Sequence, residues 1–411
     1  MKPVIYEYHQ HLINIDHIDK DALYVISTLQ HHGYLSYLVG GSIRDLLLGT
    51  IPKDFDVSTS ARPEEIKRIF PGALLIGKRF RLAHVRFGKK VIEVSTFRSG
   101  DNQEDNLITQ DNTWGTPEQD ALRRDFRING LFYDPSTQTL IDYVQGFEDI
   151  QKKTLQAIGE PYVRFRQDPV RMIRLLKFQA RFDLNVDEKT KIALLENRNE
   201  ILKSSQARVF EEILRMLESG SSCKFFELMT EHGLLEPLLP KISHFMEHDH
   251  QRKIMLFLKE MDYIFKKHHL ASVERSLLLT CMIYPIVEDC LKKLYSEDPQ
   301  KFHFGIIQQE TIKIVDHTLL PFFHVPRKIK SIIISICATQ FRFTPLSGSK
   351  PKQYKLPLIE NIVPALKFLN LRSRIYPEIK PLWNAWKKFS DSIKTEEPQK
   401  IKRRRKFRRR R

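Results

Sequence analysis

The chain has 411 residues, 41 % of them hydrophobic, and a formal net charge of +17 at pH 7. This length allows two or three domains, and the apolar content is that of a globular protein with a sizeable core. The amino terminus is too polar for a secretory signal, and the longest strongly apolar run, at 331–338, is too short to span a bilayer, so we expect a soluble, cytoplasmic protein.

Up to about residue 150, short apolar runs alternate with turns, and this pattern predicts a head of mixed strands and helices. A helix is expected at 43–48, and another opens at Pro63, because proline suits the first turn of a helix. Gly88 and Lys89 predict a tight hairpin, and the polar segment 101–118 predicts a loop. The expected strands are 34–39, 55–59, 80–87, 90–97, 128–133 and 139–144.

From about Asp168 onward, nearly every segment fits a helical period. The expected breaks are near Gly220, Gly233, Pro240 and Pro326. These changes of pattern predict a head at 1–155, a helical neck at 156–240, a helical body at 241–394 and a charged tail at 395–411.

The tail is rich in lysine and arginine and carries ten positive charges between residues 400 and 411. Such a segment cannot bury apolar surface, so we expect it to be disordered when free. The four cysteines, Cys223, Cys281, Cys290 and Cys337, lack the spacing of zinc ligands. We expect them to be buried free thiols in a reducing compartment.

Asp54 and Asp56 flank Phe55 at the start of a predicted strand. Side chains two residues apart on a strand project from the same face, so two carboxylates would meet there and favour a cation such as Mg²⁺. Glu93 lies on a later strand and completes a two-metal cluster if the two strands are neighbours. The alternatives are that the aspartates are turn residues after Pro52 and that Glu93 is a solvent-facing strand residue.

Gly40 and Gly41 lie between a predicted strand and a predicted helix. Glycine lets the backbone approach a ligand, and exposed N–H groups at the start of a helix favour phosphate. Arg44, one turn into the helix, can reach a phosphate oxygen. A tight turn that simply requires glycine is the alternative.

These features assemble into a known pattern. The segments Leu38–Gly41, Arg44–Asp45 and Asp54–Asp56 together resemble the class II nucleotidyltransferase superfamily, which contains the CCA-adding enzymes and the bacterial poly(A) polymerases. Its second to fifth motifs are matched, in family order, by Arg123–Asn129, Ile141–Gly146, Asp168–Arg174, and Arg208 with Glu211 and Glu212. The resemblance implies an α+β fold: a polymerase-β-like nucleotidyltransferase head with a small mixed sheet and helices, then an all-α neck and body and a disordered basic tail.

The resemblance also implies roles for individual residues. Asp54 and Asp56 would bind two Mg²⁺ ions, Glu93 would assist them, and ATP would be the substrate. Asp125 would also lie in the active site. The residues implied to face the nucleotide near its phosphates and ribose are Gly40, Gly41, Arg44, Arg124, Asp125 and Asn129. Without this context, Arg124 and Asp125 would be interpreted as a surface ion pair.

Asp168 precedes Pro169 and is expected to be the N-cap of a helix. In the family, the matching Asp and the Arg three residues on read the incoming base, which implies that role for Asp168 and Arg171, with Arg174 one turn further on. An acceptor beside donors fits both adenine and cytosine, so this pair does not choose between ATP and CTP. Three positions depart from the family pattern: Arg127, Gln145 and Gln167.

Two features favour the poly(A) polymerase branch over the CCA-adding branch. The segment Ile76–Val85 resembles a stretch that marks those polymerases, and so does the arginine-rich tail. Such a tail grips phosphates without reading sequence. The residues expected to bind RNA are Arg403, Arg404, Arg405, Arg408, Arg409, Arg410 and Arg411. A solubilising end, or contact with an acidic membrane surface, is the alternative.

The expected reaction is attack of an RNA 3′-hydroxyl, on mRNA or another transcript, at the α-phosphorus of ATP, with release of pyrophosphate. A metal-dependent phosphohydrolase is a rival, because His248, Asp249 and His250 are adjacent. No further ligands are evident at suitable places, so a polar helix end is preferred. A non-catalytic RNA-binding protein is a third class, which the intact carboxylates argue against.

Overall fold

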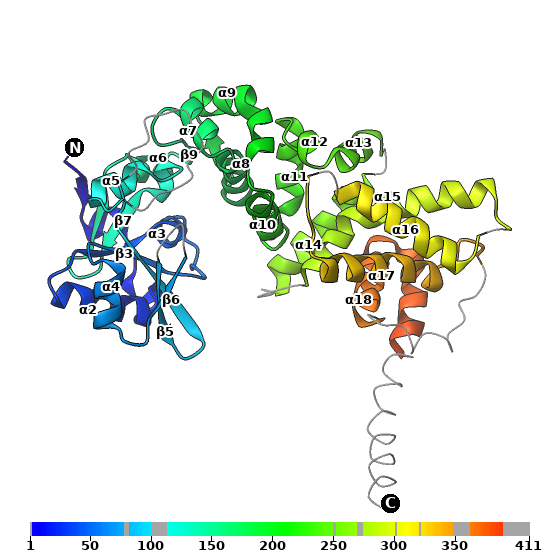
Figure 1. Cartoon of the computed structure of the whole chain (residues 1–411), viewed down its shortest axis with the longest axis horizontal. Coiled ribbons are helices and arrows are strands. Elements are labelled where there is room, and N and C mark those ends of the chain that lie inside the picture. Colours follow the sequence, from blue (N-terminus) through cyan, green and yellow to red (C-terminus); the bar gives the residue numbers. More distant parts are fainter. Residues whose placement is uncertain are drawn as a thin grey trace, which may run out of the picture. The chain divides into compact units, whose positions relative to one another are not determined.

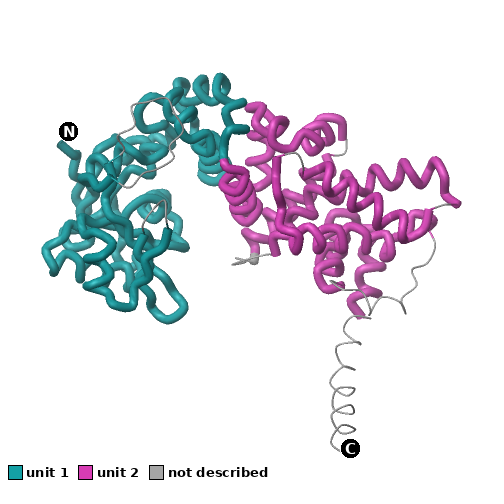
Figure 2. The backbone as a smooth tube through the Cα atoms, viewed as in Figure 1, with its two compact units in different colours: residues 1–204 teal, residues 205–411 magenta. Residues whose placement is uncertain are grey.

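The computed structural model describes residues 2–77, 82–99, 113–249, 252–268, 274–300, 302–319, 322–348 and 362–388. The chain divides into two compact units, 1–204 and 205–411 (Figure 2). The first unit combines a sheet with helices, and the described part of the second is helical (Figure 1). The prediction of a mixed head followed by a helical part is therefore confirmed. Within the described residues, no helix has both the length and the apolar content needed to cross a bilayer.

The first unit is built on a mixed sheet. In the described residues the strand order is β1-β8-β7-β2-β3-β6-β5-β4. Neighbouring strands are antiparallel except β3 and β6, which are parallel and place Asp56 opposite Glu93. The strands are β1 Val4–Tyr6, β2 Ser36–Val39, β3 Asp56–Thr59, β4 Leu74–Ile76, β5 Leu82–Phe87, β6 Lys90–Thr96, β7 Leu131–Asp134 and β8 Thr139–Asp142.

Two helices, α2 (Lys20–His31) and α4 (Pro63–Ile69), cover one face of this sheet. Helix α2 packs on β2, β3 and β6, and α4 packs on β4 and β5. Val57 and Val94 lie opposite one another and are buried on this face. Because successive residues of a strand face opposite sides, the acidic residues beside them project from the other face.

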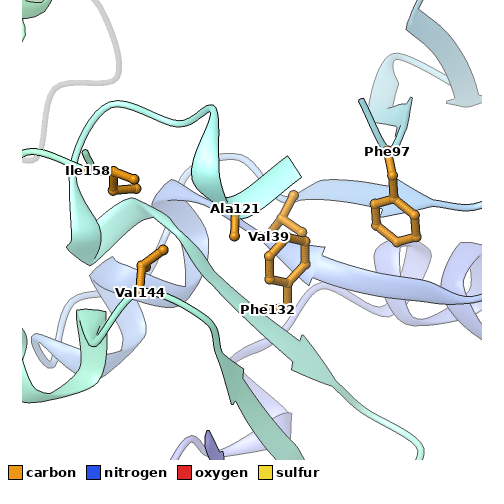
Figure 3. Close-up of a cluster of buried hydrophobic side chains, with 6 residues drawn as sticks. All are labelled: Val39, Phe97, Ala121, Phe132, Val144 and Ile158. Carbon is orange, nitrogen blue, oxygen red and sulfur yellow. The ribbon is translucent and has the colours of Figure 1, made fainter. Parts of the chain in front are cut away.

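A hydrophobic cluster lies on that other face (Figure 3). The cluster consists of Val39, Phe97, Ala121, Phe132, Val144 and Ile158. The rings of Phe97 and Phe132 meet edge-to-face, with centroids 6.2 Å apart. Val39 is the residue opposite Asp56 in the β2–β3 pair. The cluster therefore lies beside the strands that carry the acidic residues, since Val39 is on the neighbouring strand β2 and Phe97 directly follows β6.

Helices and turns connect the strands, and α7, α8 and α9 follow the sheet. A short parallel pair, β9 (Thr154–Leu155) with β10 (Asn185–Val186), joins the segments between them. The helices and turns are α1 Tyr8–His11, η1 Ile15–His17, α3 Gly41–Leu47, α5 Pro117–Leu122, η2 Arg127–Asn129, α6 Gly146–Gln151, α7 Pro161–Gln167, α8 Val170–Phe182, α9 Glu188–Asn197 and η3 Arg198–Lys203.

In the second unit, helices end or begin at the predicted breaks. Gly220 and Gly233 have positive φ, and each follows the end of a helix. Pro240 opens a helix, and Pro326 precedes one. The described elements are α10 Gln206–Leu217, α11 Ser222–Glu231, α12 Leu235–Leu238, α13 Pro240–His248, α14 Lys253–His268, α15 Arg275–Glu297, α16 Phe304–Leu319, α17 Arg327–Phe343, α18 Ile362–Ile375 and η5 Pro377–Ile379. One core cluster joins Phe343, Ala365, Leu366, Leu369 and Trp386.

All four cysteines are free, as expected, but only Cys281 and Cys337 are buried, whereas Cys223 and Cys290 are half-buried. Some expected bounds differ from the structure. Strand β3 begins at Asp56, so Asp54 precedes the strand. Residues 128–129 belong to turn η2 rather than to a strand. The segments 78–81 and 100–112, which include parts of an expected strand and an expected loop, lie outside the described residues.

Gly146→Ala is expected to destabilise the first unit. A Cβ at Gly146 would lie 2.1 Å from the carbonyl oxygen of Arg127, so α6 or η2 would have to move. Overpacking of this kind costs about 1–3 kcal/mol, which chemical unfolding would show as a lower midpoint. Gly72→Ala is the matched control, because a Cβ there meets nothing within 4 Å. Equal midpoints for the two variants would contradict the prediction.

Candidate active site

Two glycines form the turn between β2 and α3. Gly40 has a φ of +71°, in the left-handed region that favours glycine. A Cβ at Gly40 would lie 3.0 Å from Nη1 of Arg124, and one at Gly41 would lie 3.3 Å from Nη2 of Arg44. The glycines therefore let two guanidinium groups approach the turn.

Three carboxylates lie at the junction of β3 and β6. Asp56 lies opposite Glu93, so the two side chains project from the same face. Asp54 lies two residues before Asp56, and Phe55 between them is buried. The pKa of Asp56 is raised to about 6: loss of solvent around the carboxyl is the largest cause, the charges of Glu93 and Asp54 add to it, and Arg124 opposes the rise. The two strands are thus neighbours, as expected, and the three negative charges act on one another.

This group of carboxylates fits a hard cation. All three side chains remain accessible to solvent, and their repulsion disfavours ionisation of Asp56 unless positive charge is near. Among the described residues, no three potential ligands already surround one point. Mg²⁺ does not require such a cage, because it is commonly held by one or two carboxylates together with waters and substrate phosphates.

His84 of β5 adjoins the acidic group and was not expected there. It lies opposite Glu93 on the side away from Asp56. Its Nε2 is 3.6 Å from Oε1 of Glu93. The sequence could have predicted this neighbour, because counting outward from the hairpin turn at Gly88 and Lys89 pairs residue 84 with residue 93.

Arg124 is held beside the carboxylates by a buried ion pair. Its Nη2 lies 2.8 Å from Oδ2 of Asp120, which is fully buried in α5. Its guanidinium lies 5.5 Å from the ring centroid of Phe132. With Gly40 on one side and Asp56 within electrostatic range, Arg124 offers a fixed positive charge suited to phosphate oxygens.

Asp125 is a buried hub of hydrogen bonds. Its Oδ1 accepts from the backbone N–H of Phe126 and from Nδ2 of Asn129, both at 2.9 Å, and its Oδ2 accepts from Nε of Arg174 at 2.7 Å. Burial acts to raise the pKa of Asp125, but Arg174, Asn129 and Arg171 outweigh it and hold that pKa well below its ordinary value. Asp125 is therefore ionised and links the second motif to α8.

Arg44, expected to face the triphosphate, is buried and turned toward the protein in this structure. Its Nε and Nη2 donate to Oδ1 of Asp45 at 2.9 and 2.6 Å, and its Nη1 donates to Oδ1 of Asn129 at 2.7 Å. The ring centroids of Phe178 and Phe182 each lie 4.7 Å from its guanidinium carbon. Each guanidinium nitrogen is thus hydrogen bonded within the protein, and Arg44 joins α3 to η2 and α8.

Helix α8 supplies partners to two aspartates of the head. Arg174, Phe178 and Arg181 recur at a spacing that places them on one face of the helix. Arg174 bonds Asp125, and Nη2 of Arg181 lies 2.9 Å from Oδ2 of Asp45. The helical spacing was visible in the sequence, but the partners were not, because they lie far away along the chain.

Asp168 was expected to be the N-cap of a helix, and this is wrong: it follows the end of α7, and Pro169 occupies the N-cap position of α8. Arg171 is buried and donates to the carbonyl oxygens of Arg123 at 2.9 Å and Arg124 at 3.3 Å. Burial lowers the pKa of Arg171, and the nearby charges of Asp125 and Asp168 oppose that lowering. The base-reading pair inferred from the resemblance is therefore adjacent, and Arg171 also supports the backbone of Arg124.

The histidines of α13 do not form a metal site in the described residues. Nδ1 of His248 lies 2.8 Å from the carbonyl oxygen of His244, and Asp249 accepts from the backbone N–H of Lys253 at 2.6 Å. This is the polar helix end that was expected. His250 and the arginines of the tail, Arg403 to Arg405 and Arg408 to Arg411, lie outside the described residues.

A cavity of about 300 Å³ lies in the second unit, where α11, α13 and α14 meet. Its lining includes Glu227, Glu231, Glu247 and Asp249. Four carboxylates repel the phosphates of ATP and RNA, and none of the expected nucleotide-binding residues lines this cavity. It is therefore separate from the candidate site.

Asp56→Asn is expected to stabilise the metal-free protein above its folded pKa. That pKa, about 6, exceeds the ordinary aspartate pKa of 3.8. The folded state therefore holds a proton that the unfolded state releases, and stability falls as the pH rises through this window. The variant should melt at a higher temperature than wild type at about pH 8 and at the same temperature at about pH 4.

Mg²⁺ should raise the melting temperature of wild type more than that of Asp56→Asn, since binding to the folded state stabilises it. Asp16→Asn, at an exposed position in η1, is the control and should follow wild type throughout. A variant that melts below wild type at the higher pH would contradict the prediction.

Asp125→Asn is expected to lower the free energy of unfolding by about 3 kcal/mol at neutral pH, because it breaks a largely buried ion pair with Arg174. The pKa of Asp125 in the folded state lies below the ordinary aspartate pKa of 3.8. Its contribution to the free energy of unfolding is therefore complete above pH 3.8 and is lost as the pH falls below that value. Chemical unfolding at about pH 7 and about pH 3 should show that the difference in free energy of unfolding between wild type and variant is smaller at the lower pH. The same difference at both pH values would argue against the ion pair.

Comparisons with known proteins cover both parts of this chain. The model of the Poly A polymerase head domain matches residues 36–156, and that of a "Probable RNA and SrmB- binding site of polymerase A" matches residues 183–246. Poly(A) polymerase I of Salmonella typhi is 32 % identical over 409 residues, which span 94 % of this chain and 86 % of that protein.

CCA-adding enzymes are also similar. That of Lactobacillus helveticus is 35 % identical over 216 residues, 52 % of this chain and 54 % of that enzyme. The crystal structure of the Bacillus stearothermophilus CCA-adding enzyme in complex with CTP has the same fold, with a TM-score of 0.66 and 24 % identity over 91 % of this chain and 82 % of that one. The sequence similarity to poly(A) polymerase I spans nearly the whole chain, which therefore belongs to the bacterial poly(A) polymerase family of nucleotidyltransferases.

Proposed function

We propose that this protein adds adenylates to RNA 3′ ends without a template, using ATP and releasing pyrophosphate. The register of β3 and β6 carries the proposal, because it sets Asp56 beside Glu93, with Asp54 and Arg124 within electrostatic range. Membership of the poly(A) polymerase family supports it. In the reaction, the 3′-hydroxyl oxygen of the RNA forms a bond to the α-phosphorus of ATP, and the bond from that phosphorus to pyrophosphate breaks.

Asp54 and Asp56 would hold two Mg²⁺ ions, and Glu93 would assist them. When bound, two such ions lower the pKa of the attacking hydroxyl and stabilise charge on the leaving group. The raised pKa of Asp56 agrees with this role, because a neighbouring cation favours the ionised carboxylate.

The Gly40–Gly41 turn and Arg124 would bind the triphosphate. Arg124 lies between that turn and the carboxylates, where its N–H groups can donate to phosphate oxygens and stabilise charge that develops during the transfer. The residues that hold this arrangement in place would be Arg44, Asp125, Asn129 and Arg174, which are hydrogen bonded to one another or to α8.

Asp168 and Arg171 would recognise the base. A carboxylate accepts from the exocyclic amino group of adenine, and a guanidinium donates to its ring nitrogen. Cytosine presents the same two groups, so this pair rejects guanine and uracil, and the preference for ATP over CTP comes from other contacts of the nucleotide.

The arginines of the tail, Arg403 to Arg405 and Arg408 to Arg411, would bind RNA phosphates without reading sequence. We place this activity in the cytoplasm and expect mRNA or other transcripts as substrates. Lysine and arginine in the tail suit a protein that must engage many different RNA ends.

A CCA-adding activity on tRNA is the second candidate, because the fold matches the Bacillus stearothermophilus CCA-adding enzyme. The two functions differ in product. A CCA-adding enzyme uses CTP as well as ATP and stops after one CCA end, whereas a poly(A) polymerase continues with ATP alone.

The assay supplies pure protein and Mg²⁺ with ATP alone, CTP alone or both nucleotides together, and with an unstructured RNA oligomer or a tRNA that lacks its CCA end. Long adenylate ladders on the oligomer are expected. The double variant Asp54→Asn/Asp56→Asn should lose about 1,000-fold in rate, as expected if about 4 kcal/mol of transition-state stabilisation depends on the metals. Asp16→Asn should retain full activity. Addition that halts at a completed CCA end would establish the second candidate instead.

A further inference from the structure

The sheet face that carries Glu93 continues past the acidic residues to the edge of the sheet. Glu93 lies opposite His84 of β5, and His84 lies opposite Leu74 of β4. Residues opposite one another in a sheet project from the same face. Asp56, Glu93, His84 and Leu74 therefore form one row that runs from the candidate metal ligands to an edge strand.

Among the described residues, this face carries exposed side chains, several of them apolar. Arg86 lies opposite Val91, and Ile76 lies opposite Leu82, in the rows on either side. Leu74, Val91 and Ile76 are 40 %, 40 % and 43 % exposed. Grouped exposed aliphatic side chains are typical of a binding surface. We name this surface the β4–β6 platform; it consists of Leu74, Ile76, His84, Arg86 and Val91.

The opposite face of the same strands is packed. Ala83, Val85, Ile92 and Val94 are each 4 % exposed or less, and helices α2 and α4 pack on these strands. Strands β5 and β6 are therefore exposed on the platform face and buried on the other. The face left open is the one that carries the acidic residues.

The direction of the proposed reaction brings the RNA to this side. Gly40 and Arg124, assigned above to the triphosphate, lie on the β2 side of Asp56. In phosphoryl transfer the attacking and leaving oxygens lie roughly in line, so the RNA hydroxyl enters opposite the pyrophosphate. In the sheet, β5 and β4 lie on the side of Asp56 and Glu93 that is opposite to β2, so they form the side from which the RNA enters.

We propose that the β4–β6 platform binds the last nucleotides of a single-stranded RNA; this inference rests on the proposed function. Arg86, which is exposed, contacts a backbone phosphate. Leu74, Ile76 and Val91 support the faces of unstacked bases, which are accessible in single strands whatever the sequence. Contacts of this kind hold the 3′ end beside Glu93 and do not depend on which RNA is bound.

A cross-linking experiment tests the location directly. The full-length protein is irradiated with a short oligoadenylate whose last nucleotide is 4-thiouridine, and the modified peptide is identified by mass spectrometry. Adducts within 74–76 or 82–93 are expected. Adducts confined to other parts of the chain would overturn the proposal. This readout does not require that any nucleotide be added.

Kinetics test the contacts, with matched controls on the opposite face. Leu74→Ser should raise KM for the RNA oligomer several-fold and leave KM for ATP unchanged, whereas Leu75→Ser should change neither. Leu75 is 42 % exposed, nearly the same as Leu74, but it projects from the other face. Equal effects of the two substitutions would contradict the platform.

Charge reversal gives a second pair. Arg86→Glu should raise KM for RNA about 10-fold at low salt and reduce the slope of log KM against log salt by about 0.7, the value for one phosphate contact on a single strand. Arg68→Glu, at an exposed position of α4, is the control and should alter neither quantity. An unchanged salt slope for Arg86→Glu would remove the phosphate contact from the proposal.

The outcomes separate this inference from the proposed function. If wild type adenylates RNA but the Leu74 and Arg86 variants behave like their controls, only the platform is wrong. If wild type adds nothing to any RNA, the proposed function fails, and the cross-link alone decides whether the platform binds RNA. If wild type gives no adduct within 74–76 or 82–93, the proposal that the platform binds RNA is wrong, whether or not the protein adenylates RNA.

Discussion

The first unit depends on a single electrostatic constraint, namely that two carboxylates face one another across a parallel pair of strands. Like charges opposite one another in a sheet are destabilising, and the pKa of Asp56 is raised first by burial of its carboxyl and then by the charge of Glu93. Apolar packing holds the register on both faces, with Val57 and Val94 on one side and the cluster around Val39 on the other. The fold thus maintains an unfavourable local arrangement, which a bound cation would relieve.

The arginines around this site have different tasks, although the sequence places several of them in similar motifs. Arg124 lies at the glycine turn within reach of the carboxylates, whereas Arg44 is buried between two phenylalanine rings and bonds Asp45 and Asn129. Arg174 likewise bonds a carboxylate of the protein, that of Asp125. Together with the bond from Arg181 to Asp45, this contact joins α8 to the head through two carboxylates.

The sequence predicted the parts of this site that depend on local pattern. The strands at 55–59 and 90–97, the glycine turn and the hairpin at Gly88 are present. The orientation of Arg44 could not be predicted, because the groups that hold it, Asn129 and Phe178, lie far along the chain. Strand β4 was missed because its three residues are exposed on both faces and so show no alternation. The N-cap assigned to Asp168 was one residue early, an error within the usual uncertainty of helix ends.

Strand β4 also bears on the solubility of the protein. It has a paired neighbour on one side only in the described sheet, and its three residues, Leu74 to Ile76, are all aliphatic. Flat apolar edges of this kind seed aggregation unless a charge guards them. Lys67 fills that place: its Nζ donates to the carbonyl oxygens of Pro71 at 2.6 Å and Ala73 at 2.5 Å, just before the strand begins. An ammonium fixed there hinders the addition of a foreign strand while the aliphatic face stays uncovered.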